Sequence, residues 1–137
     1  MSQIAWSDEL SVGQQRLDAQ HKRLIRLINA VQAPGQDAAA LADVLEKLLA
    51  YAAKHFGDEE NYIVAHAPQL IERHFPLHSA FIEKVYGFVH SFNEGCTTEL
   101  QPLVHAFLCD WLAAHIKEED QLYAEAKRQK AKAQASA

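Results

Sequence analysis

The chain has 137 residues, of which 49% are hydrophobic and 23% are charged, a composition that indicates one folded domain and excludes a disordered chain. Its net charge of −5 argues against binding nucleic acid, and two cysteines are too few for a disulfide framework or a Cys-rich zinc site. We find neither a signal-peptide pattern nor an apolar run long enough for membrane insertion, so we expect a cytoplasmic protein.

Helical periodicity recurs in four segments, whereas strand patterns are weak. An irregular arm of about residues 1–13 comes first, with Trp6 as its expected anchor, and breaks at 33–37, 66–69 and 93–98 separate the segments. Spacings that alternate between four and three place side chains on one inward face. In chain order, these four inward stripes are Leu17, His21, Leu24, Ile28 and Val31; Leu41, Leu45, Leu48, Ala52, His55, Glu59 and Tyr62; His74, His78, Phe81, Val85, Phe88 and Phe92; and Val104, Leu108, Trp111, His115, Glu118 and Leu122.

Short connections force successive helices to run antiparallel. The sequence therefore predicts an all-α protein, an up-down-up-down antiparallel four-helix bundle over residues 1–130, with a short C-terminal tail at 131–137. Asp37 is expected to cap the second helix, and Thr98 and Gln101 have the spacing of a capping box for the fourth. The basic C-terminal end is expected to be a solvated, fraying helix end.

Polar residues interrupt the apolar stripes on all four helices: His21, His55, Glu59, His74, His78 and His115. Each buried polar side chain without a partner would cost about 1–3 kcal/mol. A metal removes this cost because imidazole and carboxylate groups become its ligands, so a metal site is predicted. The chain has no Glu-x-x-His or His-Glu-x-x-His pattern, which disfavours a ferritin-like or zinc-protease site.

The segments "HFGDEE", "HFPLHSAF" and "WLAAHIKEED" resemble the hemerythrin-like proteins, in particular the bacterial single-domain hemerythrins, and the likeness covers nearly the whole chain. The resemblance implies a non-heme di-iron centre with an oxo or hydroxo bridge. The ligands it implies are His21, His55, Glu59, His74, His78, His115 and Asp120. It further implies that His74, His78 and His115 serve one iron and that His21 and His55 serve the other, where one position stays open for O₂.

The segment "HIKEED" gives two different answers for the second carboxylate. In a regular helix Glu118 lies near the face of His115, whereas Asp120 is rotated from it by about 140°. The family motif favours Asp120, and we adopt that assignment. It predicts that the helix deviates between His115 and Asp120, most simply through a π-bulge that absorbs one residue.

Four residues are expected to line the O₂ pocket: Leu24, Ile63, Leu108 and Trp111. Ile63 stands where family members often carry Met, so this lining departs from the usual pattern. Tyr62 and Glu118 are the polar residues expected nearest the centre. Either could donate a hydrogen bond to O₂, but the simpler interpretation is that they pack in the core or lie at a solvated helix end.

Several further residues receive predictions of their own. Pro76 lacks a backbone N–H, so the third helix should begin late or kink, with His74 in its first turn. The histidines outside the stripes are expected at the surface: His66, His90 and His105. Cys109 is expected to pack as a small apolar residue.

The leading functional hypothesis is reversible O₂ binding for transport, storage or local supply, without catalysis. The apolar stripes around the predicted ligands favour binding without turnover. Two alternatives stay open: a di-iron redox enzyme (an oxidase, a nitric-oxide-handling protein or an iron donor in iron–sulfur repair) and an O₂ or redox sensor. O₂ is the expected ligand, and an O₂-consuming recipient protein is left open as a partner.

Overall fold

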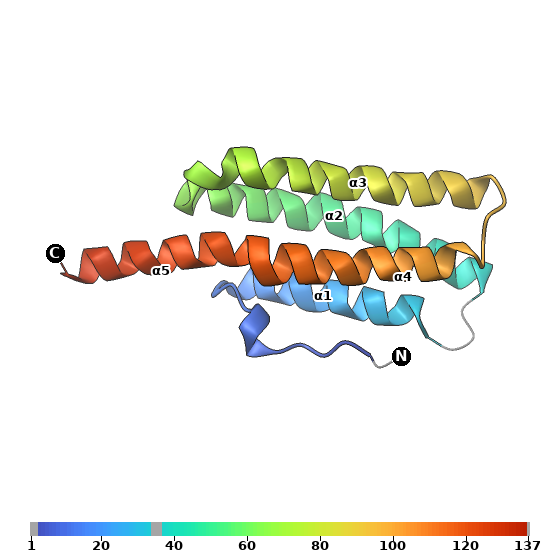
Figure 1. The fold of residues 1–137 in the computed structure, drawn as a ribbon, viewed down its shortest axis with the longest axis horizontal. Coiled ribbons are helices and arrows are strands. Elements are labelled where there is room, and N and C mark those ends of the chain that lie inside the picture. Colours follow the sequence, from blue (N-terminus) through green and yellow to red (C-terminus); the bar gives the residue numbers. More distant parts are fainter. Residues whose placement is uncertain (1–2, 34–36, 137) are drawn as a thin grey trace.

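The computed structural model describes residues 3–33 and 37–136, which form an antiparallel four-helix bundle without strands in this part of the chain (Figure 1). Helices α1 (Gln15–Val31), α2 (Ala38–His66) and α3 (Ile71–Asn93) are the first three. The fourth is continuous but has three parts: α4 (Leu100–Trp111), the π-helix η3 (Leu112–Glu119) and α5 (Asp120–Ser136). The predicted fold class is confirmed.

Short elements connect and precede these helices. A single turn, η1 (Asp8–Leu10), lies in the N-terminal arm, and another, η2 (Pro68–Leu70), joins α2 to α3. None of the helices in the described ranges is both long and apolar enough to cross a membrane.

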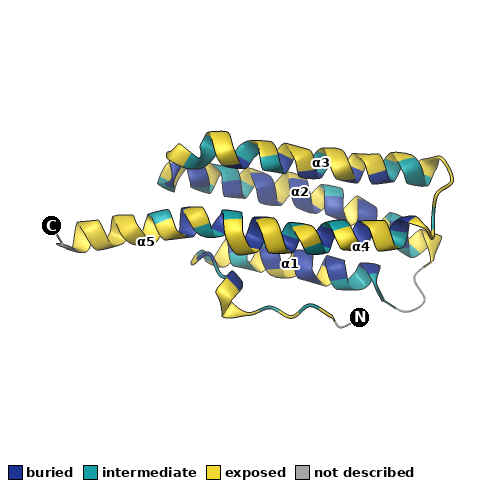
Figure 2. Ribbon diagram, viewed as in Figure 1, coloured by how far each residue is buried: buried dark blue, intermediate teal, exposed yellow. Residues whose placement is uncertain are grey.

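The predicted stripes form the buried faces of the helices, as the buried bands in Figure 2 show. The α1 stripe is buried along its whole length, from Leu17 to Val31. The fourth stripe is wrong beyond His115, because Glu118 and Leu122 are exposed. The π-helix shifts the register there, so that Tyr123 and Ala124 become buried instead.

The N-terminal arm is held to α1 by backbone and side-chain contacts. Trp6 packs against the core as predicted, with the ammonium of Lys22 5.0 Å from its ring centroid. The Asn29 side chain both accepts from the Ile4 N–H and donates to the Ile4 carbonyl, each at 2.9 Å. Leu10 is buried more deeply and joins the core.

Of the two helix caps predicted from the sequence, the one at the start of α2 is present and the one at the start of α4 is not. Asp37 caps α2, accepting from the Ala40 N–H at 2.8 Å. The capping box expected at α4 is wrong: the Thr98 hydroxyl donates to the Glu99 carboxylate, and the Gln101 amide donates to the Val31 carbonyl. The Gln101 side chain therefore ties α4 to the end of α1 instead of closing its own helix.

α3 begins five residues before Pro76 and has His74 in its first turn, as expected. Pro76 lies beyond the first four residues of α3, so its missing N–H leaves the carbonyl of residue 72 without that hydrogen bond, yet the helix continues to Asn93.

At the other end of the chain, α5 extends past the bundle, and residues 127–135 are exposed (Figures 1 and 2). The helix continues through residue 136, and our boundary for the tail at 131 stays a prediction.

Candidate metal centre

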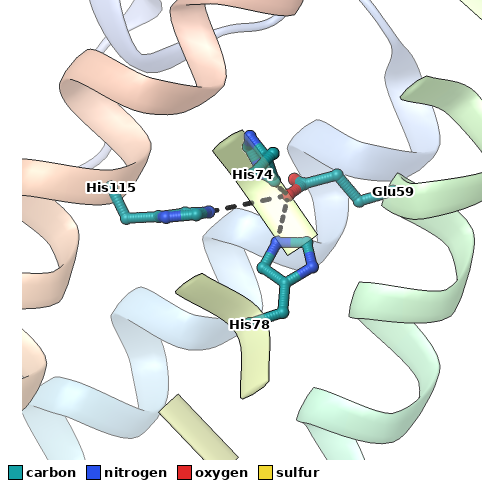
Figure 3. A group of neighbouring side chains, drawn as sticks. All are labelled: Glu59, His74, His78 and His115. Atoms are coloured by element: carbon teal, nitrogen blue, oxygen red, sulfur yellow. Dashed lines mark hydrogen bonds and ion pairs between the residues drawn. The ribbon is translucent and has the colours of Figure 1, made fainter. Parts of the chain in front are cut away.

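The structure brings all seven predicted ligands together in the middle of the bundle. They come from α1, α2, α3, η3 and the first residue of α5, and each is at most 3% exposed. Figure 3 shows Glu59, His74, His78 and His115 pointing toward one another from three different helices. Two overlapping groups have ligand atoms within 4.8 Å of one another: Glu59 with His74, His78 and His115, and Glu59 with His21 and His55.

The Glu59 carboxylate faces both groups, with one oxygen toward each. Its Oε1 lies 2.9 Å from Nε2 of both His74 and His78 and 3.7 Å from that of His115. Its Oε2 lies 3.3 Å from Nε2 of His21 and 3.2 Å from that of His55. A carboxylate with this placement can bridge two cations.

The Asp120 carboxylate is divided in the same way. Oδ1 lies 3.0 Å from Nε2 of His115 and 3.2 Å from that of His74, whereas Oδ2 lies 3.1 Å from that of His21. Six buried side-chain atoms of the centre make no hydrogen bond of acceptable geometry within the described structure. They are both carboxylate oxygens of Asp120 and both ring nitrogens of His21 and of His115. Buried polar groups left in this state are costly, and bound cations would satisfy them. The residues therefore fit a metal centre.

The π-helix η3 brings Asp120 to this point. The Asp120 N–H donates to the His115 carbonyl five residues earlier, the hydrogen bond that defines a π turn. The wider turn returns Asp120 to the face of His115, while Glu118 points to solvent. The predicted deviation of the helix is confirmed, and Glu118 is exposed and belongs to neither group of ligand atoms.

Deleting Lys117, which is exposed within η3, should preserve metal binding. The deletion leaves His115 and Asp120 four residues apart, on one face of a regular α-helix. Deleting the exposed Lys54 from the regular helix α2 is the matched control, because it rotates the preceding half of α2 by about 100° relative to His55 and Glu59. Iron content and circular dichroism would be compared, and equal losses in the two variants would contradict this account.

Aromatic rings fix the orientation of three of the histidines. Trp111 stacks on His115 with centroids 4.0 Å apart, Phe56 on His78 at 3.9 Å, and Tyr51 on His55 at 5.0 Å. Trp111 was expected in the O₂ pocket. Of the other expected lining residues, Leu24 and Leu108 belong to the larger core cluster and Ile63 to a smaller one, and their role stays a prediction.

Hydrogen bonds to the far ring nitrogens set two tautomers. His55 Nδ1 lies 2.6 Å from the side-chain amide oxygen (Oε1) of Gln20, and His78 Nδ1 lies 2.8 Å from a Glu60 carboxylate oxygen. Both acceptors require Nδ1–H, which leaves Nε2 free to bind a metal. Gln20 and Glu60 were not predicted, since both are only half-buried and lie beside the stripes.

Tyr123 is another residue that the sequence analysis missed. Its buried hydroxyl donates to Glu59 Oε2 at 3.0 Å. The half-buried Tyr62, expected nearer the centre, packs edge-on against the Tyr123 ring. Burial and the nearby carboxylates of Asp120 and Glu59 raise the pKa of Tyr123, so the phenol keeps its proton. Counting three residues on from Asp120 would have found it.

Replacing Tyr123 by Phe should destabilise the metal-free protein by about 1.5–3 kcal/mol, because a hydrogen bond to a buried carboxylate is lost. Tyr62→Phe is the matched control: the Tyr62 hydroxyl has no hydrogen-bond partner in the described part of the chain, so we expect a change below about 0.5 kcal/mol. Urea unfolding measures both. Equal effects would show that the Tyr123 hydrogen bond contributes nothing.

Protonation in the metal-free protein follows from these contacts. Burial disfavours the charged imidazole, but Asp120 and Glu59 outweigh it and raise the pKa of His21 to about 10 and that of His74 to about 9. Burial lowers the pKa of His55. Despite burial, the facing histidines lower the pKa of both Glu59 and Asp120.

The metal-free protein should therefore lose stability as the pH rises. A histidine whose pKa increases on folding stabilises the fold fully below its ordinary pKa of 6.5, and this stabilisation disappears through the folded values of about 9 and 10. Metal-bound histidines are already neutral, so the loaded protein should not show this loss. Thermal unfolding of both forms between pH 6.5 and 9 measures the difference, and a gap that narrows with pH would contradict the prediction.

Comparisons with known proteins point to one family. The profile of the Hemerythrin HHE cation binding domain matches residues 12–126. A bacteriohemerythrin of Pseudomonas paraeruginosa is 32% identical over 130 residues, which are 93% of this chain and 84% of that protein. A myohemerythrin of Riftia pachyptila is 30% identical over 116 residues, 85% of this chain and 87% of that protein.

Proposed function

This chain belongs to the hemerythrin family, and from that premise we propose that it binds O₂ reversibly at a pair of iron ions in the centre of the bundle. One observation carries the proposal. The two oxygens of Glu59 face unequal sets of histidines, three on one side and two on the other. Two cations held in this way would have unequal numbers of protein ligands, so the one with fewer could accept a small molecule.

In this proposal His74, His78 and His115 would hold one iron, His21 and His55 would hold the other, and the carboxylates of Glu59 and Asp120 would be shared between the two. The iron pair, when bound, supplies the electrons that O₂ accepts. The protein's own contribution is to fix the ligands and exclude water. The stacked rings of Tyr51, Phe56 and Trp111 hold the imidazoles in place.

The apolar surroundings favour binding over turnover. Leu24, Leu48 and Leu108 belong to the larger core cluster. All three are 0% exposed and carry no group that could deliver a proton. Such a lining should also keep water away from the metal and slow its oxidation.

A redox enzyme is the second candidate, and one observation favours it. A surface groove of ≈ 350 Å³ beside Trp111 includes His115 in its lining, so solvent comes close to a proposed ligand there. An external reductant could approach the centre at this point.

An optical spectrum of the iron(II)-loaded protein, recorded with metal analysis, tests the proposal. A visible charge-transfer band that appears with O₂ and disappears on argon purging, at two irons per chain, is the expected result. A band that decays irreversibly, or never appears, would shift the assignment to the redox enzyme.

A further inference from the structure

The two sides of the centre differ in the group that accepts a hydrogen bond from the far nitrogen of a histidine. On the three-histidine side, Nδ1 of His78 lies 2.8 Å from a carboxylate oxygen of Glu60. On the two-histidine side, Nδ1 of His55 lies 2.6 Å from the amide oxygen of Gln20. One acceptor therefore carries a negative charge, whereas the other is neutral.

The amide of Gln20 is held in one orientation by a second hydrogen bond. Its Nε2 donates to Oδ2 of Asp58 at 2.7 Å, and Oδ1 of Asp58 pairs with the ammonium of Lys54 at 3.3 Å. Turning the amide over would place its oxygen against the Asp58 carboxylate and its NH₂ group against the Nδ1–H of His55. The acceptor on this side is therefore fixed as a neutral one, and the carboxylate stands one step further from the histidine.

A carboxylate that accepts from Nδ1–H makes an imidazole a stronger electron donor to a metal at Nε2 than a neutral acceptor does. Stronger donation stabilises iron(III) over iron(II). We propose that this difference makes the two irons unequal in redox potential: the iron on the side of Glu60 is oxidised more readily than the iron on the side of Gln20. Two irons must be bound for this inequality to exist, so it rests on the function proposed above.

Glu60 and Gln20 are positioning residues, since each acts on the iron through a histidine. The Glu60 side chain is 31% exposed, so water weakens the field of its charge at a distance. Its effect therefore acts mainly through the hydrogen bond to His78, whose side chain is only 2% exposed.

The inequality suits reversible binding of O₂ on the two-histidine side. The iron that binds O₂ must recover its electron when O₂ leaves. A neutral acceptor on His55 keeps the potential of that iron high, which favours its return to iron(II). The charged acceptor on His78 stabilises iron(III) on the other side, where three histidines leave less room for a small molecule.

Two isosteric changes test this inference and should have opposite effects. Glu60→Gln removes the charge from the acceptor of His78 and should raise the lower of the two potentials. The double variant Gln20→Glu with Asp58→Asn exchanges amide and carboxylate at constant net charge, and it should lower the higher potential. Changes in such supporting groups alter metal affinity by about 10–100-fold. A tenfold change confined to iron(III) shifts a one-electron potential by about 59 mV.

Redox potentiometry of the di-iron protein, followed in the visible spectrum, gives the potential of each one-electron step. Both variants should narrow the gap between the two steps, while the mean of the two potentials rises in Glu60→Gln and falls in the double variant. Asp58→Asn alone is the control, because it keeps the neutral Gln20 on His55 and should leave the gap as in the wild type.

Nitrogen NMR of the metal-free protein checks the hydrogen bond itself. The Nδ1 of His78 should be protonated in the wild type and in Glu60→Gln alike, because an amide oxygen accepts in place of the carboxylate. A His78 ring without Nδ1–H in the wild type would remove the basis of the inference.

Shifts of the same sign in the two variants, or a gap that neither variant changes, would overturn the inference. A protein that holds two irons but does not bind O₂ reversibly would refute the proposed function alone, since the two potentials are measured without O₂. A protein that holds a single iron would overturn both.

Discussion

Replacing His55 by alanine should abolish O₂ binding while iron remains on the other side of the centre. His55 faces Glu59 Oε2 together with His21, so the variant leaves a single histidine on that side. Loss of a residue that only hydrogen-bonds a metal ligand lowers metal affinity by about 10–100-fold. Loss of the ligand itself should lower the affinity for the iron on that side by more. His74, His78 and His115 keep their positions around Oε1. His21→Ala should give the same result.

Two measurements together test this prediction: iron analysis gives the iron content of the variant, and the O₂-dependent visible band reports O₂ binding. The expected protein retains roughly half its iron, by the division of ligands, and shows no reversible band. His90→Ala is the control, because His90 is exposed on α3 and should leave both quantities unchanged. Full O₂ affinity in either the His21 or the His55 variant would refute the assignment of the O₂-binding side.

Removing the Glu59 carboxylate should affect both sides at once. Glu59 is 0% exposed and lies within 3.7 Å of all five histidine nitrogens of the centre. In metal-free Glu59→Ala, buried histidine charges lose a partner, which typically costs about 3–5 kcal/mol. With iron, the variant should lose metal from both positions, since a bridging ligand serves two ions.

Glu118→Ala is the matched control for this variant. Glu118 is a carboxylate close to His115 in sequence but exposed, so its removal should change stability by less than about 0.5 kcal/mol. Chemical unfolding and iron analysis of both variants give the comparison. Glu59→Ala protein that kept a full iron complement would show that the carboxylate does not bridge.

The fold could be predicted from sequence because hydrophobic spacing and helix packing agree over most of the chain. The stripe from Leu17 to Val31 is buried as expected, and the polar residues that interrupt the stripes meet in space. The choice of Asp120 needed the family resemblance, since helix geometry alone favoured Glu118. Its consequence, a distorted helix, was then predictable.

The missed features share a physical cause. Periodicity predicts which face of a helix a residue occupies, but it predicts neither how far a long side chain extends nor where the helical register changes. The π-helix rotates everything after it, so Tyr123 was overlooked and Leu122 was wrongly placed inside. Gln20 lies beside the stripe, yet its long side chain reaches His55 on another helix. His105 was expected at the surface but is only 8% exposed, and the spacing along the sequence did not indicate this burial.

The position of the polar centre divides the apolar core into two unequal clusters. The larger includes Leu24, Phe81 and Leu108, while the smaller has six buried residues among those that the structure describes, Leu17 and Tyr123 included, at the end from which α5 extends. Without metal, the buried histidines and carboxylates of the centre repel one another or lack bonding partners. A cluster this small contributes too little stability to keep its end of the bundle closed against that cost. Metal loss should then open this end first and expose the adjoining helix to proteases. The cellular lifetime of the chain would thus depend on its metal content, and empty molecules would be removed before full ones.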